Sequence, residues 1–465
     1  MRIRLPNNCR PRTASGSRKL VAQTIVLGTV AWLCCAGAAQ AQEPAQLGQI
    51  LERLDRLEEQ NRALVEEVHA LRSELEAARA SAAPAPAVEE RVAVSENRIS
   101  ELAQTKVEAA RRFPIRLTGM ALFDSFWDSR AGAADGYPAV SAPDAGRSAG
   151  ATLRQTILGL EYWGPETLWG GKVRGSVMMD FFGGSGRSLD QLVRLRTASI
   201  GIDWKNRSFE AGILKPLISP RDPDSLAQVG IPPLAGAGNL WQWMPQTRFE
   251  QRFDLGPGTE VRAQLAAVQT DEAAAYGGYP APAGGPAVEP KRPGIEGRVE
   301  FSRGEERRIE IAPGFHSSVS HVAGTPVPSD VFSLDWYAKP GGPAEFKGAF
   351  FTGENASNLG TAGQGFAILA SGRTAPVHST GGWAQLTLKA TSRLSFHVLS
   401  GAEDDRRSDL VPGQIGRNLA YGANFFYRLA PNVLLSVESM QVRTNYAAAA
   451  WLLGNHYDLA LGYLF

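Results

Sequence analysis

From about residue 113 onward, the chain alternates apolar and polar residues with a period of two. In residues 172–181, KVRGSVMMDF, the apolar side chains fall mainly on one parity and the charged ones on the other. The same split appears in residues 115–128, 248–254 and 295–301. Because successive side chains of a strand point to opposite faces, each segment predicts a strand with one apolar and one polar face. Soluble sandwiches alternate too, so a single segment does not distinguish a core from a membrane.

The connections between these segments separate the two interpretations. We predict about sixteen strands, beginning near residues 115, 151, 171, 191, 208, 246, 259, 294, 308, 330, 344, 381, 392, 417, 432 and 455. Tight turns such as KNRS, GPGT, RGEE and APN alternate with long connections, for example near 216–244, 317–328 and 354–379. Large outer-membrane barrels have short periplasmic turns, long outer loops and an even strand number. The pattern therefore predicts an all-β transmembrane barrel of about 16 antiparallel strands over residues 113–465.

The last segment, NHYDLALGYLF, has an apolar and aromatic parity that continues to Phe465. We interpret it as the closing strand of the barrel, with its aromatic face toward lipid. A carboxyl-terminal Phe that follows alternating apolar residues also resembles the signal by which the assembly machinery recognises outer-membrane barrels. This resemblance implies that the barrel-assembly machinery is a partner during biogenesis. A soluble β domain that ends on a core strand is the alternative.

Residues 1–41 have the pattern of a bacterial export signal. Six basic residues and no acidic residue come before Leu20. An apolar stretch follows from Leu20 to about Ala36, and then the small-residue site Ala39-Gln40-Ala41. We predict a signal peptide that is cleaved before Gln42. An uncleaved membrane helix is the alternative, since the run approaches the roughly 20 residues that span a bilayer.

The rest of the composition excludes several classes of site. Cys9, Cys34 and Cys35 all precede the predicted cleavage site, so the mature chain would have no disulfide or thiolate metal site. Without its first 41 residues the chain has 42 basic and 47 acidic residues and no basic run, which argues against a nucleic-acid partner. No later segment approaches 18 uninterrupted apolar residues, so a closed barrel is the membrane-spanning option that remains.

Residues 42–80 contain a heptad repeat. Positions a are Leu47, Leu54, Asn61, Val68 and Leu75, and positions d are Ile50, Leu57, Leu64, Leu71 and Ala78. This repeat predicts a coiled coil, which we place in the periplasm, and a coiled coil implies an oligomer. The polar Asn61 would fix the register of the helices. A single helix that folds back on the barrel is the alternative.

Residues 81–112 are predicted to link the coil to the barrel. Pro84 and Pro86 interrupt the helix within an alanine- and proline-rich stretch, which is typical of a short stiff linker. A weaker helical pattern follows from about Val92 to Arg112 and ends before Pro114.

If the polar parity faces a lumen, that lumen is rich in arginine. The predicted pore-lining and solute-binding residues are Lys172, Arg174, Arg194, Arg196, Arg248, Arg252, Arg262 and Arg298. Fixed positive charge in a water-filled pore concentrates anions, so we expect small anionic solutes. Asp180, Glu250 and Glu296 alternate with these cations, and cross-strand ion pairs without any selectivity are the alternative interpretation.

The connection from Pro216 to Gln246 is the second notable feature. It contains several prolines and also the aromatic residues Trp241 and Trp243. Connections of this length are usually functional or mobile. We predict that it folds into the lumen and narrows the pore, with Arg221, Asp222 and Asp224 near the constriction. A lid outside the barrel, or a contact with a neighbouring subunit, is the alternative.

Catalytic motifs are scarce. The six histidines show no HExxH spacing or paired metal-ligand spacing, so no metal or cofactor is expected. The glycine-rich stretches GTAGQG and GGSGRS lie in predicted loops without the strand–loop–helix setting of a phosphate site. We expect no enzyme activity, although a Ser-His pair brought together by the fold would not be visible in the sequence.

Five features of the sequence carry a resemblance to a known family: the export signal, the heptads, the first strand FPIRLTGMALFDSFWDS, the stretch LKPLISPRDPDSLAQVGIPPLAGAGNLWQWMPQTRFE and the terminal Phe. Together they resemble the DcaP-like family of trimeric outer-membrane channels. The resemblance spans nearly the whole mature chain. It implies a sixteen-stranded barrel, a homotrimer with a periplasmic coiled-coil extension, and uptake of small, often dicarboxylic, anions. It also implies that Arg174, Arg194, Arg196, Arg248 and Arg252 line the pore.

The predicted function is therefore that of an outer-membrane porin in a Gram-negative bacterium, which allows passive diffusion of small hydrophilic anions such as dicarboxylates. A structural role is the main alternative, in which the barrel anchors a coil that links it to the periplasm or peptidoglycan. An outer-membrane enzyme and a soluble β protein are the others.

Overall fold

The computed structural model describes Ser73 and residues 114–130, 136–137, 139–183, 191–270, 288–290, 292–304 and 308–465. The chain divides into two compact units, residues 1–104 and 105–465. Apart from Ser73, the described residues all belong to the second unit. The predicted signal peptide, coiled coil and linker lie outside the described residues, so they remain predictions.

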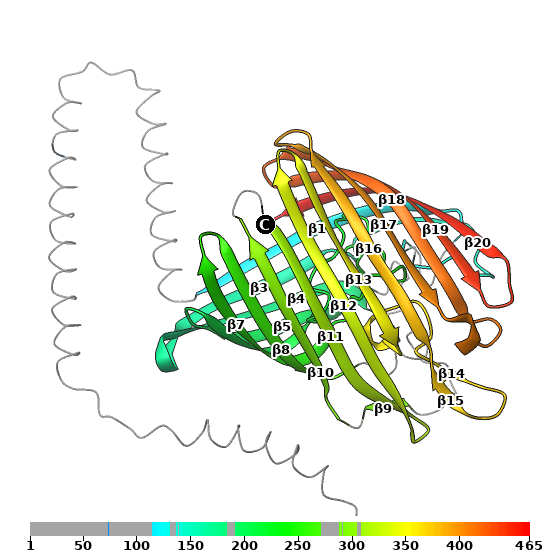
Figure 1. Cartoon of the computed structure of the whole chain (residues 1–465). Coiled ribbons are helices and arrows are strands. Elements are labelled where there is room, and N and C mark those ends of the chain that lie inside the picture. The colour runs from blue at the N-terminus through cyan, green and yellow to red at the C-terminus, as the bar shows by residue number, and fades with distance from the viewer. Residues whose placement is uncertain are drawn as a thin grey trace, which may run out of the picture. The chain divides into compact units, whose positions relative to one another are not determined.

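The second unit is built from antiparallel strands, coloured from cyan to red along the chain in Figure 1. The strands of the main sheet are β1 (Ile115–Asp128), β2 (Ser148–Thr152), β3 (Ile157–Thr167), β4 (Gly171–Gly183), β5 (Leu192–Asp203), β6 (Arg207–Leu214), β7 (Met244–Gly256), β8 (Thr259–Val268), β9 (Val288–Pro290), β10 (Gly294–Arg303), β11 (Ile309–Val322), β12 (Thr325–Gly341), β13 (Ala344–Glu354), β16 (His378–Lys389), β17 (Leu394–Asp405), β18 (Ile415–Ala430), β19 (Val433–Tyr446) and β20 (Trp451–Leu464). A separate hairpin joins β14 (Phe366–Ile368) and β15 (Thr374–Pro376), and the short 3-10 helices are η1 (Leu168–Gly170), η3 (Ala356–Leu359) and η4 (Arg407–Asp409).

The main sheet closes on itself. Each long strand pairs antiparallel with its neighbour in the chain, and β1 pairs with β20 from Met120↔Leu464 to Asp128↔His456. The short strands β2 and β9 extend β3 and β10, because β1 pairs with both β2 and β3 while β11 pairs with both β9 and β10. Counting each extended strand once gives a closed barrel of 16 strands, as the sequence predicts. Among the described residues, no helix is long and apolar enough to cross a bilayer.

The alternating residues of each strand lie on the two faces of the barrel wall, the large apolar side chains outside and the polar ones inside. In β20, Leu459 and Leu461 are 47% and 44% exposed, whereas Ala460 between them is fully buried and Asp458 is 5% exposed. Large apolar side chains are exposed in the same way on strands around the barrel, from Phe123 on β1 to Phe350 on β13. An uncovered apolar band of this kind matches the lipid-facing surface of outer-membrane barrels.

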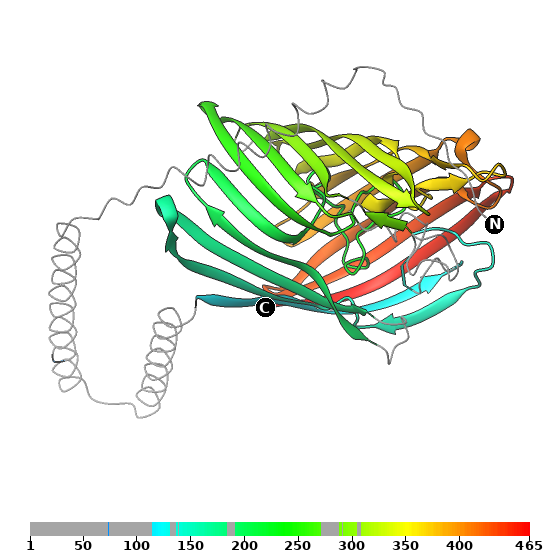
Figure 2. The ribbon, with the colours of Figure 1, turned by 90° about the horizontal axis from the view of Figure 1, so that it is seen from below.

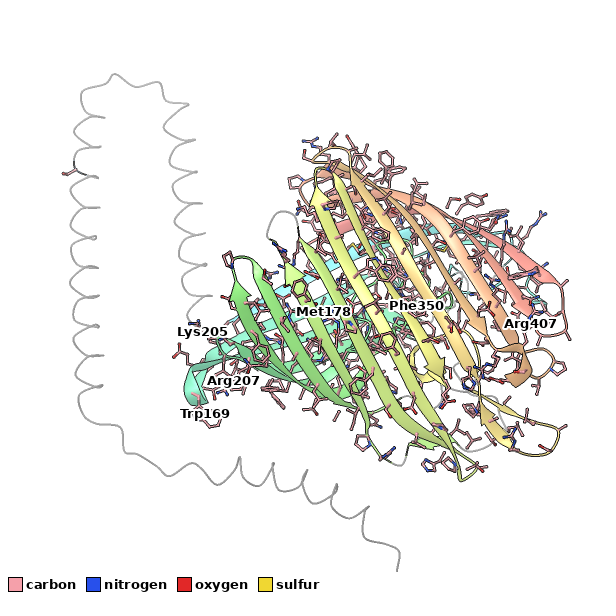
Figure 3. The ribbon with its side chains drawn as sticks, viewed as in Figure 1. Trp169, Met178, Lys205, Arg207, Phe350 and Arg407 are labelled. Atoms are coloured by element: carbon pink, nitrogen blue, oxygen red, sulfur yellow. The ribbon has the colours of Figure 1, made fainter. Side chains whose placement is uncertain are left out.

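The two ends of the barrel differ. At one end the turns are short, as between β5 and β6 (residues 204–206) or between β7 and β8 (residues 257–258), and Figure 3 labels Lys205 and Arg207 there. At the other end lie longer connections, one of which contains η4, where Arg407 is labelled. The prediction of a long connection near residues 317–328 is wrong. There β11 and β12 continue past the barrel wall, and only residues 323–324 join them.

Candidate functional site: a loop and an arginine-rich wall inside the barrel

Residues 215–243, which we call the inner loop, connect β6 and β7. The loop has no strand of its own, and its five prolines cannot donate to a β ladder. Many of its residues are buried against the polar faces of strands on several sides of the barrel, as its hydrogen bonds show in the following paragraphs. Figure 2 shows the barrel from a second direction, with this green segment between its walls.

Arg221 fixes one side of the inner loop. Its guanidinium forms ion pairs with Asp335 of β12 and Glu310 of β11. Burial lowers the pKa of Arg221 from its ordinary value, and the negative charge of Asp335 opposes that shift. Asp335 also accepts hydrogen bonds from Arg298 at 2.8 and 2.9 Å. The loop is thus tied to β11 and β12 by a network in which both carboxylates are buried.

Asp224 fixes the loop to a second group of strands. Its carboxylate accepts hydrogen bonds from Lys347 on β13 at 2.8 Å and from Gln385 on β16 at 2.6 Å. The backbone carbonyl of Asp224 accepts a further bond from Asn424 on β18 at 2.9 Å. The neighbouring Asp222 bonds within the loop instead, to Lys215 and Asn239.

The central part of the loop is held by Gln155 and Glu438. Gln155 donates to the Ala227 carbonyl at 2.6 Å and accepts from the backbone amides of Val229 and Gly230 at 2.7 and 2.9 Å. On β19, Glu438 accepts from Ser225 and from Gln228, both at 2.6 Å. Sequence reasoning missed Gln155 and Glu438 as residues that hold the loop. Their residue types carry no motif, and their partners are far away in the chain.

Gly238 lets the loop approach the wall closely. Its φ is +94°, and an added Cβ would lie 2.6 Å from the Ala402 carbonyl oxygen of β17. We expect Gly238→Ala to destabilise the barrel by roughly 1–3 kcal/mol. The backbone of residue 238 has a left-handed conformation that alanine adopts only with strain, and the added Cβ would collide with backbone atoms that cannot easily move. The unfolding temperature in detergent measures this loss. Gly146→Ala is the control, since no atom lies within 4 Å of its added Cβ. Equal unfolding temperatures for the two variants would contradict the close packing.

Two of the predicted arginines face the inner loop from β5. Arg194 and Arg196 share one carboxylate, Asp180 of β4, at 2.7 and 3.0 Å. Arg196 also donates to the Val229 carbonyl at 2.6 Å, and both guanidinium groups lie over the ring of Trp243, 5.2 and 4.7 Å from its centroid. Two cations therefore share one fully buried anion beside the loop.

A polar cavity of about 400 Å³ lies against strands β4–β8. It is lined by Arg174, Asp203, Trp204, Ser208, Glu210, Arg248, Glu250, Arg252 and Gln264. Arg174 pairs with Asp203 at 2.7 Å and with Glu210 at 2.9 Å. Arg248 bonds to neutral acceptors only, the Gln246 side chain at 2.7 Å and the Lys215 carbonyl at 2.8 Å. Among the described residues no carboxylate forms an ion pair with Arg248, so its charge stays uncompensated by direct contact.

The structure does not bring every predicted site residue together. Arg262 lies between Glu250, Glu260 and Glu300 at 3.5–3.9 Å, and Arg298 is buried with Glu300 and Asp335. Lys172 is exposed at the start of β4. Trp241 packs edge-on against Trp243, with ring centroids 5.5 Å apart.

Negative and positive charges are buried unequally in the described residues. The buried carboxylates are Asp124, Asp128, Asp180, Glu296, Glu300, Glu310, Asp335, Glu403, Asp405, Glu438 and Asp458. Within the same part of the chain only two arginine or lysine side chains, Arg154 and Arg298, are buried to this degree. Arg174, Arg194 and Arg252 keep 26–36% of their side-chain surface exposed. Positive charge is therefore more accessible to a solute than the near-equal numbers of bases and acids suggest.

A Ser-His-Glu arrangement does occur on β10 and β11. His316 contacts Ser318 Oγ at 2.9 Å through Nε2 and Glu296 Oε1 at 3.0 Å through Nδ1. All three side chains are buried, and Glu296 also accepts a bond from the Leu217 amide of the inner loop. Because the group is buried and Glu296 binds the inner loop, we interpret it as part of the loop anchor.

Comparison with known proteins establishes the fold. No protein-family model and no curated protein sequence matches the chain. The outer membrane channel DcaP of Acinetobacter baumannii matches with a TM-score of 0.64 and 18% identity, over 76% of this chain and 97% of that one. An anion-selective porin from Comamonas acidovorans matches with a TM-score of 0.51 and 11% identity, over 76% and 99%. The predicted resemblance to DcaP-like channels is thus confirmed at the level of the fold.

Proposed function

We propose that the chain is an outer-membrane porin through which small hydrophilic anions diffuse passively. The observation that carries this proposal is the unequal burial of charge: among the described residues eleven carboxylates but only two arginine or lysine side chains are buried, while the guanidinium groups of Arg174, Arg194 and Arg252 stay partly exposed. Because accessible positive charge raises the local concentration of anions, the lumen favours anionic solutes. The anion selectivity stated for the Comamonas porin supports the same direction.

In this proposal the inner loop narrows the pore. It is anchored to β11–β13 through Arg221 and Asp224, and to β19 through Ser225 and Gln228. The solute path then runs along the wall of β4–β8, where the cavity lies. The predicted homotrimer, its periplasmic coiled coil and a preference for dicarboxylates belong to the same proposal and rest on the resemblance stated above.

Recordings in a planar lipid bilayer test the function. We expect open-channel conductance, and in a salt gradient a reversal potential whose sign reports anion preference. Conductance steps in groups of three would support the trimer. A silent protein that inserts into the bilayer would favour a structural anchor, and a reversal potential of cation sign would reject the proposed selectivity.

A further inference from the structure

Two arginines interrupt the apolar outer face of β18 and β19. The outward positions of these strands include the exposed Tyr421 and Val437. Arg417 and Arg443 occupy the same parity near the ends of their strands and are exposed. Arg407 of η4 is exposed beside them. We call these three residues the rim arginines. Figure 3 labels Arg407 at the end of the barrel opposite Lys205 and Arg207.

The strand register brings the rim arginines together around Asn445. Arg417 pairs with Asn445 across β18 and β19, and Arg443 lies two residues before it on the same strand. Arg407 donates to the Asn445 side chain at 3.5 Å. Diagonal neighbours across an antiparallel pair are within reach of long side chains. Three exposed arginines therefore lie close together on one patch of the rim.

The patch has few negative partners. Arg417 lies 3.5 Å from Asp404, and both side chains are about half exposed. Arg443 is held by neutral groups, the Tyr421 hydroxyl at 3.0 Å and the Gln441 side-chain oxygen at 2.8 Å. The described contacts thus place one carboxylate against three guanidinium groups. The neutral partners orient Arg443 without neutralising it, so its positive charge remains available to an anion.

Aromatic residues on neighbouring strands indicate where this patch lies relative to the membrane surface. Trp127 of β1 and Tyr457 of β20 pack together on the outer face, with ring centroids 5.6 Å apart, and Trp451 is exposed at the start of β20. Such girdles lie at the membrane–water boundary of outer-membrane barrels. The rim arginines are therefore at headgroup level, directly beside the surface that acyl chains would cover.

We propose that the rim arginines bind a phosphate group on the head of an outer-leaflet lipid, an inference that rests on the proposed outer-membrane location. Guanidinium groups bind phosphate oxygens through paired, charge-assisted hydrogen bonds. The adjacent apolar face of β18–β20 gives the acyl chains of the same molecule a surface to cover. The lipid is thus recognised by its charge and by its chains together.

The test compares the purified full-length protein with the double variant Arg417→Gln/Arg443→Gln in detergent. Native mass spectrometry measures binding of lipid A that carries both phosphates and of lipid A without phosphate. We expect the variant to bind the phosphorylated lipid at least about tenfold more weakly, since charge-assisted bonds are lost. The dephosphorylated lipid should bind both proteins equally weakly. Arg207→Gln/Arg303→Gln, with the same charge change at the other end of the barrel, should bind like the wild type.

Each other outcome overturns the inference. Equal binding by the rim variant, or equal loss in both double variants, would show that the rim arginines are not a site. Displacement of the lipid by millimolar inorganic phosphate alone would point to a free-anion site. A change of oligomeric state in the rim variant would show an interface between copies. Ion selectivity should stay unchanged in the rim variant, because these arginines lie outside the lumen, so this test is independent of the proposed function.

Discussion

Replacing Arg221 by Ala should increase single-channel conductance severalfold and lower the stability of the barrel. Arg221 joins the inner loop to the buried carboxylates of Glu310 and Asp335, and removing one partner of a buried pair costs about 3–5 kcal/mol. Arg298 still holds Asp335, which places the expected loss at the lower end of this range. Without the anchor to Glu310 and Asp335, we expect the inner loop to move away from β11 and β12 and no longer to narrow the lumen.

Bilayer recordings and thermal unfolding in detergent measure the two effects. Arg130→Ala is the matched control, because Arg130 donates only to loop carbonyls, those of Ala142 and Pro143, and pairs with no described carboxylate. We expect its conductance to equal that of the wild type. An Arg221→Ala channel with unchanged conductance would show that the inner loop does not limit flow.

Replacing both Arg174 and Arg248 by Gln should shift ion preference toward cations. The cavity is lined by three arginines and three carboxylates, so its formal charge changes from zero to minus two. Asp203 and Glu210 lose the guanidinium that pairs with them. Because a cleft focuses the field of its charges, we expect the anion-to-cation permeability ratio to fall roughly tenfold.

Reversal potentials in a potassium chloride gradient measure this shift. The control, Arg116→Gln/Arg207→Gln, removes the same charge from residues that do not line the cavity, and we expect a much smaller change. If the cavity variant keeps the reversal potential of the wild type, the cavity is not on the path of the ions.

Period-two patterning predicted most of the barrel because each strand has one face against lipid and one against polar groups. The tight turns KNRS and GPGT fall at the ends of β5 and β7, as predicted. The hairpin at residues 323–324 was missed because Ser317–Val322 has polar residues on both parities, so its sequence does not show the alternation of a membrane strand. A strand that extends past the membrane needs no apolar face.

The candidate site was less visible in the sequence. Parity placed Arg174 and Arg194 on the polar face, but it could not show which carboxylates are buried beside them. The partners of the inner loop, such as Gln155 and Glu438, lie 72 and 210 residues from the loop residues that they bind. Only the closed barrel brings such distant residues together, so no local motif marks them.

Cysteine labelling of the two faces in lipid nanodiscs tests the central claim most directly. Leu461→Cys lies on the exposed apolar face, and Gln264→Cys lines the cavity. With the cysteines of residues 1–41 absent, we expect a water-soluble maleimide to modify Gln264→Cys rapidly and to leave Leu461→Cys unmodified. Rapid modification of Leu461→Cys together with protection of Gln264→Cys would contradict a barrel with lipid outside and an aqueous path within.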